Sequence, residues 1–279
     1  MAPEKHRIYL FICNATAPVK GRKINNFGRK IYSFKEVGST NDLAKELARK
    51  GAGQGTLVVS KVQSRGQGRF GRPWISKEGG LYFSLILKPR IKKDLISILP
   101  LLAAVAVAKA ISSLTSLKVN LKWPNDALIN EKKVAGILAE STFDKGRINS
   151  VVLGIGINVN QRRQDFPEEL REKATSLFEE IEREVNLEEL LKEVTGELEK
   201  AYLSFLGEGP SFVIKEWKKM DICLGRAIKI VTSKEAFKAK ALDLDRKGAL
   251  IVGLADGRTK TILSGEVSLE NTSFRMRME

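Results

Sequence analysis

The pattern of hydrophobic and polar residues divides the chain into three parts. In the first 160 residues, short apolar and β-branched segments predict strands over 31–37, 56–63, 81–87, 133–141 and 150–160. Two apolar segments with helical spacing lie between them. One opens at Ser39-Thr-Asn-Asp42 and stops at Gly51, and the other covers 96–114. This part of the chain therefore mixes strands and helices, as α/β and α+β proteins do.

Helices dominate the middle part of the chain and short strands its end. Asn186, with Glu189 three residues later, predicts the start of a helix, and 212–220 predicts another. After residue 224, five short strands are predicted over 228–231, 236–242, 250–254, 259–263 and 266–269. Strands of this length and spacing are typical of a small barrel, so a domain boundary is expected near residue 224.

The first thirty residues are basic and irregular and show no sustained periodicity. We expect them to form an extended arm with one short strand at Ile8–Ile12. The predicted organisation is therefore an arm over 1–30, a mixed domain over 31–224 and a small all-β domain over 225–279.

Composition restricts the chemistry. The chain has one histidine, His6, and two cysteines, so we expect neither a zinc cluster nor histidine-based catalysis in its main body. The formal charge of +15 favours anionic partners such as nucleic acid, nucleotide phosphates or an acidic protein, although solubility alone explains it equally well. The longest apolar stretch is interrupted by Pro100 and Lys109. We therefore expect a buried helix there, no membrane partner and a cytoplasmic location.

The loop Gln63-Ser-Arg-Gly-Gln-Gly-Arg-Phe-Gly-Arg-Pro-Trp74 carries the strongest signal for binding. Its glycines let the backbone approach a ligand and supply amide donors to an anion. Arg69 and Arg72 add guanidinium groups that hold phosphate or carboxylate oxygens in pairs. The alternative is a flexible basic surface loop.

Three later segments have a similar character. Trp123-Pro124 predicts a rigid turn that presents Asn125 and Asp126 together, suited to magnesium-bound phosphates or simply to an Asx turn. Lys133 begins a strand and is expected to point inward with Ala135 and Ile137 on its face.

The third of these segments is a strand that contains two glycines. Gly154 and Gly156 open a flat shelf on one face, unless the strand is narrowed there for helix packing, and Asn158 continues that face. The Ser39-Thr-Asn-Asp42 segment is by default a helix cap, which also places Thr40 or Asn41 within reach of a ligand.

Taken together and in order, these segments resemble the biotin protein ligase family. They are Ser39-Thr-Asn41, Gly66–Trp74, Lys122-Trp-Pro-Asn-Asp126, Lys133–Leu138 and Gly154-Ile-Gly-Ile-Asn158. The resemblance implies a mixed-sheet catalytic domain, of the kind shared with class II synthetases, and a small C-terminal all-β barrel of the SH3-like type. It also implies that biotin and ATP form biotinyl-adenylate, with Mg²⁺ as the activating ion, and that the biotinyl group then passes to a lysine of a biotin carboxyl carrier domain.

The resemblance implies roles for individual residues. Lys133 and Arg69 are the expected catalytic residues, and Asp126 is expected at the metal. The expected biotin-binding residues are Ser39, Thr40, Asn41, Gln63, Gly66, Gln67, Arg69, Lys133, Gly136 and Gly154. The expected ATP-binding residues are Arg69, Arg72, Trp74, Asn125, Lys133 and Asn158.

The chain departs from the family pattern in two ways. Gln67 stands where the family commonly has arginine, which removes one guanidinium from the loop. Thirty irregular residues are too few for the DNA-binding domain of repressor members, so a ligase that does not bind DNA is expected.

A homodimer is a further hypothesis. The alternatives are ligation of lipoate or another acyl group and, more remotely, a nucleic-acid-binding module.

Overall fold

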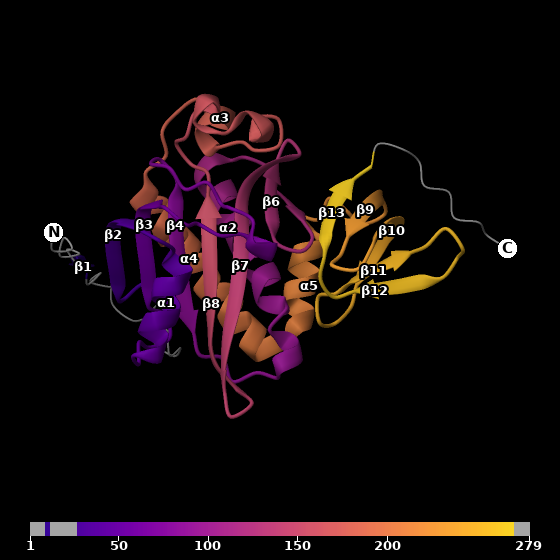
Figure 1. Cartoon of the computed structure of the whole chain (residues 1–279), viewed down its shortest axis with the longest axis horizontal. Helices are drawn as coiled ribbons and strands as arrows, with labels where there is room; N and C mark the ends of the chain where they lie inside the picture. Colours follow the sequence, from indigo (N-terminus) through magenta and orange to yellow (C-terminus); the bar gives the residue numbers. More distant parts are fainter. Residues whose placement is uncertain (1–8, 12–26, 271–279) are drawn as a thin grey trace.

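The computed structural model describes residues 9–11 and 27–270, which form two sheets (Figure 1). The larger sheet has the strand order β1-β2-β3-β4-β8-β7-β6-β5. Strands β2 and β3 run parallel, and the other neighbours are antiparallel, so the sheet is mixed as predicted. Its strands are β1 (Tyr9–Phe11), β2 (Ile31–Val37), β3 (Leu57–Gln63), β4 (Leu81–Leu87), β5 (Asn120–Lys122), β6 (Asp126–Ile129), β7 (Lys132–Asp144) and β8 (Arg147–Ile157).

Of the predicted N-terminal arm, the structure describes residues 9–11 and 27–30, and the remainder lies outside the described residues. Strand β1 falls within the short strand expected at residues 8–12 and pairs with the outer edge of β2. Strands β2 and β4 begin and end at the predicted residues.

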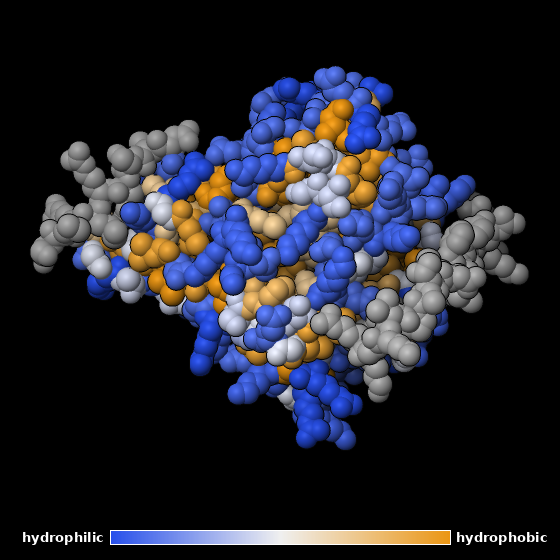
Figure 2. All heavy atoms as spheres, turned by 180° about the vertical axis from the view of Figure 1, so that it is seen from behind, coloured by the Kyte–Doolittle hydropathy of each residue, from blue (hydrophilic) through white to orange (hydrophobic). Residues whose placement is uncertain are grey.

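Helices cover both faces of the large sheet. Helix α1 (Thr40–Arg49) lies on one face, and α2 (Ile98–Thr115), α4 (Leu187–Glu208) and α5 (Pro210–Lys218) lie on the other. A short helix, α3 (Leu177–Ile181), follows β8 at one end of the sheet. Seen from behind, hydrophilic side chains cover much of the surface, with hydrophobic ones exposed between them (Figure 2).

Helix α2 is the centre of the core, and 12 of its 18 residues are buried. With the turn before it, over Lys93–Thr115, it is the one helix in the described part of the chain with the length and composition to cross a membrane. The interruptions at Pro100 and Lys109 therefore do not by themselves exclude a helix of membrane-spanning length. However, 67% of its apolar stretch is buried inside the protein, so the predicted buried helix is confirmed.

The five C-terminal strands form a separate antiparallel sheet in the order β12-β11-β10-β9-β13. They are β9 (Ala227–Val231), β10 (Ala236–Leu244), β11 (Leu250–Gly253), β12 (Thr259–Ile262) and β13 (Glu266–Leu269). Among the described strands no pairing joins β12 to β13, as in a barrel that is partly open. The predicted all-β C-terminal domain is therefore present.

The side chain of Trp123 connects the larger sheet to the C-terminal sheet. Its side chain is 1% exposed, and its indole Nε1 donates a hydrogen bond of 2.9 Å to the carbonyl oxygen of Gly248. Gly248 has φ of 80° and lies so close to α2 that a Cβ there would be 2.6 Å from Leu101 Cδ1. These contacts give the C-terminal domain a fixed place beside the larger sheet.

Candidate functional site

A cleft of about 700 Å³ opens on the α1 face of the large sheet, where the start of α1, the 63–74 loop, strands β6 to β8 and strand β13 meet. The predicted site residues that line it are Ser39, Thr40, Asn41, Gln63, Gln67, Arg69, Arg72, Trp74, Asn125, Asp126, Lys133, Gly136, Gly154 and Asn158. Tertiary folding thus brings together segments that are more than one hundred residues apart in the sequence.

Gly66 is the predicted site residue that does not line the cleft. It is buried at the base of the loop, where its carbonyl oxygen accepts a hydrogen bond of 2.9 Å from Trp74 N. A Cβ at this position would lie 2.5 Å from the carbonyl oxygen of Trp74 and 2.6 Å from Ser76 Oγ. Its contribution in this structure is therefore to let the loop fold back on itself.

The glycines of β7 and β8 form the floor of the cleft. A Cβ on Gly156 would lie 2.4 Å from the Trp74 Nε1, and one on Gly136 would lie 3.0 Å from the same indole. A Cβ on Gly154 would lie 2.2 Å from Asn41 Oδ1. Trp74, which lines the cleft, lies over Gly156 and Gly136, as the ligand-shelf interpretation expects, whereas Gly154 is packed against Asn41 of helix α1, as the helix-packing alternative expects.

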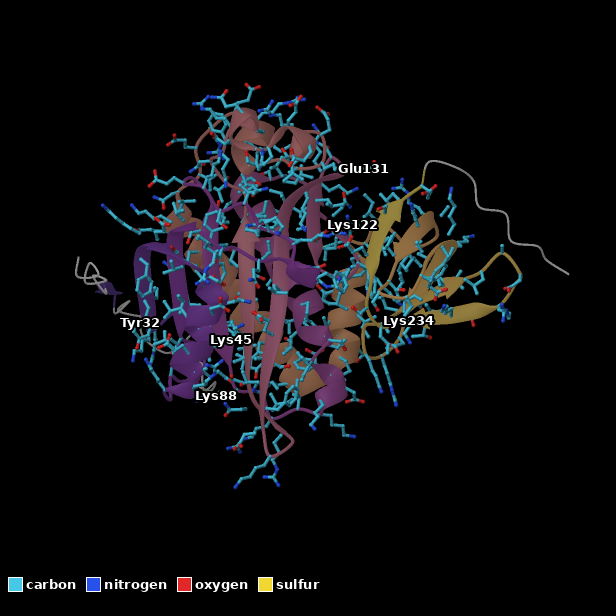
Figure 3. All side chains as sticks on the ribbon, viewed as in Figure 1. Tyr32, Lys45, Lys88, Lys122, Glu131 and Lys234 are labelled. Atoms are coloured by element: carbon cyan, nitrogen blue, oxygen red, sulfur yellow. The ribbon has the colours of Figure 1, made fainter. Side chains whose placement is uncertain are left out.

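Lys133 projects into the middle of the cleft. Its Nζ lies 2.6 Å from Asp126 Oδ1 and 5.2 Å from the centre of the Trp74 ring. Asp126 Oδ2 also lies 3.3 Å from Lys122 Nζ. Lys122, on the side of the large sheet nearest the C-terminal domain (Figure 3), was not among the predicted site residues, although it also lines the cleft. Two ammonium groups and one carboxylate leave this region with a net positive charge.

The prediction that Lys133 points inward is confirmed, but the reason given for it was wrong. Ala135 and Ile137 lie on the opposite face, buried in the core against α2. The pairing of β6 with β7 skips Val134, so a bulge shifts the alternation of side chains by one residue. Lys133 therefore shares its face with Gly136, where a Cβ would lie 3.3 Å from the Lys133 Nζ.

The arrangement around Asp126 does not fit a metal centre built by the protein. Its carboxylate is already compensated by two lysines, and the described residues contain no group of three or more His, Cys, Asp or Glu side chains that could hold a metal ion. A magnesium ion that arrives with the ATP phosphates needs only one or two protein carboxylates, so the expected place of Asp126 at the metal stays a prediction. In this structure the carboxylate is paired with Lys133 and Lys122.

The arginine loop reaches across to the C-terminal domain. Arg69 Nη1 donates a hydrogen bond of 2.9 Å to the carbonyl oxygen of Gly265, and Nη2 donates one of 3.0 Å to Ser264 Oγ. Arg72 Nη1 lies 2.7 Å from Glu266 Oε2. Burial lowers the pKa of Arg69, while the charges of Asp126 and Glu266 oppose that shift.

The opposite end of the cleft is polar but carries few charges. Thr40 N donates a hydrogen bond of 2.8 Å to Gln63 Oε1, and Gln63 Nε2 donates one of 2.9 Å to Ser76 Oγ. Ser39 caps α1, because its Oγ accepts a hydrogen bond of 3.4 Å from Asp42 N. The capping interpretation is thus confirmed, and the cap also places Thr40 and Asn41 at the cleft.

Two asparagines complete the wall at the charged end. Asn158 is 4% exposed, and its Nδ2 donates a hydrogen bond of 3.0 Å to the carbonyl oxygen of Thr175. Asn125 Nδ2 donates one of 2.7 Å to the carbonyl oxygen of Ile137, and its Oδ1 accepts a contact of 3.4 Å from Arg69 Nη1. Both amides are therefore held in fixed orientations by the backbone.

Comparison with known proteins agrees with the geometry. Residues 33–158 match the biotin/lipoate A/B protein ligase family, and residues 223–270 match the biotin protein ligase C-terminal domain. The chain is 37% identical over 250 residues to the bifunctional ligase/repressor BirA of Bacillus spizizenii, covering 89% of this chain and 77% of that protein. It is 28% identical to the biotin–[acetyl-CoA-carboxylase] ligase of Mycobacterium tuberculosis, over 86% of this chain and 88% of that protein.

A solved structure shares the same architecture. The biotin protein ligase of Aquifex aeolicus, in complex with biotin and ATP, superimposes with a TM-score of 0.74 at 34% identity, covering 87% of this chain and 99% of that one. The fold and the cleft thus define a ligase of the biotin and lipoate class. With the matching C-terminal domain and these relatives, the chain belongs to the biotin protein ligase family.

Proposed function

We propose that this chain joins biotin to a lysine of a biotin carboxyl carrier domain in two steps, with ATP and Mg²⁺. The observation that carries the proposal is Lys133, whose ammonium group stands over a glycine shelf between two ends of one cleft. One end holds the cations Arg69 and Lys122, and the other holds hydroxyl and amide groups. An acid with a polar ring at its far end fits such a cleft.

The first step joins two anions, and the positive groups of the cleft make this possible. An oxygen of the biotin carboxylate attacks the α-phosphorus of ATP, and the bond from that phosphorus to the bridging oxygen breaks. Pyrophosphate leaves with the electron pair, and biotinyl-adenylate forms. Lys133 and Arg69 reduce the repulsion between carboxylate and phosphate and stabilise the charge in the transition state. Magnesium belongs to the substrate here, as the ion that accompanies the ATP phosphates.

In the second step the amine nitrogen of a carrier lysine attacks the acyl carbon of the adenylate. The bond from that carbon to the phosphate oxygen breaks, AMP leaves, and the attacking nitrogen gives up a proton. The adenylate is a mixed anhydride that water hydrolyses readily. The 63–74 loop protects it, because Arg69 and Arg72 tie the loop to β13 and the turn before it.

Biotin is favoured over lipoate by the C-terminal part of the chain, since residues 223–270 match the C-terminal domain of biotin protein ligases. The polar end of the cleft supports the same choice, because the dithiolane ring of lipoate offers no hydrogen-bond donors. We retain two further predictions from the sequence, a cytoplasmic location and no binding of DNA. A homodimer is a third.

The test follows both half-reactions separately. The purified chain is incubated with ATP, magnesium and radiolabelled biotin, and exchange of pyrophosphate into ATP reports the first step. Addition of a carrier domain reports the second step, as label that becomes bound to protein. Pyrophosphate exchange that depends on lipoate and not on biotin would reverse the choice of acid. Strongly salt-dependent binding to DNA or RNA, with no exchange for either acid, would favour the nucleic-acid alternative.

A further inference from the structure

A chain of polar contacts outside the charged end of the cleft leads to Asn41. Lys45 Nζ lies 2.8 Å from Glu140 Oε1. The other oxygen of that carboxylate, Oε2, accepts a hydrogen bond of 2.8 Å from Asn41 Nδ2. Asn41 Oδ1 accepts one of 2.6 Å from Ser84 Oγ, which also lies 2.8 Å from Thr40 Oγ. These contacts join α1 to β4 and β7, and Lys45 lies beside the central strands in Figure 3.

The contacts fix which way the Asn41 amide faces. An ionised carboxylate can only accept hydrogen bonds, so Glu140 requires the NH₂ group of Asn41 to turn toward it. The oxygen of the amide then faces Ser84 and lies close to Gly154, where a Cβ would be 2.2 Å away. Because Ser84 gives its proton to Asn41, its own oxygen is left as an acceptor. A glutamine or another neutral group at position 140 would not fix the orientation of the Asn41 amide in this way.

The ion pair keeps Glu140 in place. Partial burial lowers the pKa of Lys45, but its hydrogen bonds and charge interactions with Glu140 and Asp42 outweigh that effect and raise the pKa overall. Lys45 is therefore charged at neutral pH. The side chains of Lys45 and Glu140 are 20% and 32% exposed, so solvent screens the pair only in part.

The position of these contacts determines which part of the bound acid lies beside them. The carboxylate that reacts belongs at Lys133 and Arg69, where the charges oppose its own. Asn41 and Thr40 line the other end of the cleft, where the body of the acid has to end, and Ser84 of β4 lies fully buried behind them. Asn41 and Thr40 are 6% and 4% exposed, so water competes little with a ligand for hydrogen bonds to them.

We propose that Glu140, held by Lys45, is a positioning residue that turns the polar end of the cleft into a hydrogen-bond acceptor and thereby selects acids whose ring carries N–H groups. The inference rests on the proposed function and names the residue that gives it specificity. A ureido ring supplies two N–H donors to the side-chain oxygens of Asn41 and Thr40, which line the cleft. A dithiolane or alkyl end supplies none, so it lacks the additional hydrogen bonds that a ureido ring makes at this end of the cleft.

The test compares Glu140→Gln with the unaltered chain in acid-dependent ATP–pyrophosphate exchange. The acids are biotin, desthiobiotin, which keeps the ureido ring, and lipoate, which lacks it. We expect the KM for biotin and for desthiobiotin to rise about tenfold, because the Asn41 amide can now turn either way. The KM for ATP and for lipoate should change by less than about twofold, because neither contacts these oxygens through N–H groups at this end.

Two further variants separate positioning from general damage. In an Asn41→Ala background, Glu140→Gln should add less than about twofold to the KM for biotin, because the effect passes through Asn41. Lys50→Met removes an exposed ion pair with Glu46 on the same helix and should leave every KM unchanged. Melting temperatures of all variants are measured in parallel.

Each result has a definite meaning. Equal increases in the KM for biotin and ATP, or no increase for either ureido acid, would overturn the inference and leave the ligase activity intact. An additive effect of Glu140→Gln in the Asn41→Ala background would also overturn it. Exchange by the unaltered chain with lipoate alone would overturn both the proposed function and the inference.

Discussion

The floor of the cleft gives the sharpest prediction, because Gly154 has no room for even one additional carbon atom. In Gly154→Ala the new Cβ would lie 2.2 Å from Asn41 Oδ1 and 2.8 Å from Asn41 Cγ and Nδ2, where ordinary contacts are 3.4–4 Å. The amide would have to retreat by about 1 Å. Hydrogen bonds to Glu140 on one side and Ser84 on the other hold it where it is.

The loss of stability expected for Gly154→Ala follows from these distances. Overpacking of a buried site typically costs about 1–3 kcal/mol. For a protein of this size that corresponds to a fall of roughly 2–4 °C in Tm for each kcal/mol. Displacement of Asn41 also disturbs the polar end of the cleft, so we expect the KM for biotin to rise by at least about tenfold, which corresponds to about 1.4 kcal/mol. Thermal unfolding and biotin-dependent pyrophosphate exchange measure the two effects.

A matched control is available in α4. Gly196 lies inside that helix, and a Cβ there would meet nothing within 4 Å. Gly196→Ala should therefore raise stability by about 0.5–1 kcal/mol, because alanine favours the helix, and should leave the KM for biotin unchanged. If Gly154→Ala instead kept the Tm and the KM of the unaltered chain, the tight contact between Asn41 and the glycine shelf would not exist in solution.

Three further predictions concern the reaction and the effect of pH. Lys133→Ala should reduce biotin-dependent pyrophosphate exchange about 100-fold or more, and near-normal exchange would remove Lys133 from the first step. Arg69→Ala should increase the free biotinyl-adenylate released into solution, measured after rapid filtration, and unchanged release would argue against closure by the loop. Burial, with the nearby Asp221 charge, raises the pKa of Cys223 from 9.0 to about 12. The stability that this neutral thiol contributes is complete below pH 9 and is lost as the pH rises toward 12. From pH 9 to 11 the free energy of unfolding should therefore fall more in the unaltered chain than in Cys223→Ala, and parallel curves would contradict this.

Periodicity predicted the elements well where a single pattern governed the segment. Strand β4 is apolar except for Ser84, strand β2 is rich in aromatic and β-branched residues, and helix α1 has a cap and an apolar stripe, so all three were predicted correctly. Lys133 shows the limit of the same reasoning. Its inward direction was predicted on alternation within the strand, but a bulge at Val134, which depends on pairing with β6, decides the face.

Several site residues gave no signal in the sequence. Ser84 is a single small polar residue in a strand that is buried along its whole length, and nothing nearby indicates that it contacts Asn41. Glu140 lies near the end of the strand predicted over 133–141 and has no pattern of its own. The turn at 264–266 was assigned to a separate small domain, yet Arg69 donates a hydrogen bond to Gly265, which is 196 residues away.

The sequence by itself determined the local structure of each segment. Cap residues, apolar spacing and the glycine-rich and arginine-rich segments specify helix starts, strands and a loop able to bind anions, because each depends on neighbours within a few residues. Tertiary structure decided which of these segments share a cleft, how Asp126 is paired and which way the Asn41 amide faces. These outcomes depend on contacts between β6, β7 and α1 and between the two sheets, and distances between residues remote in the chain are set only when the whole core packs.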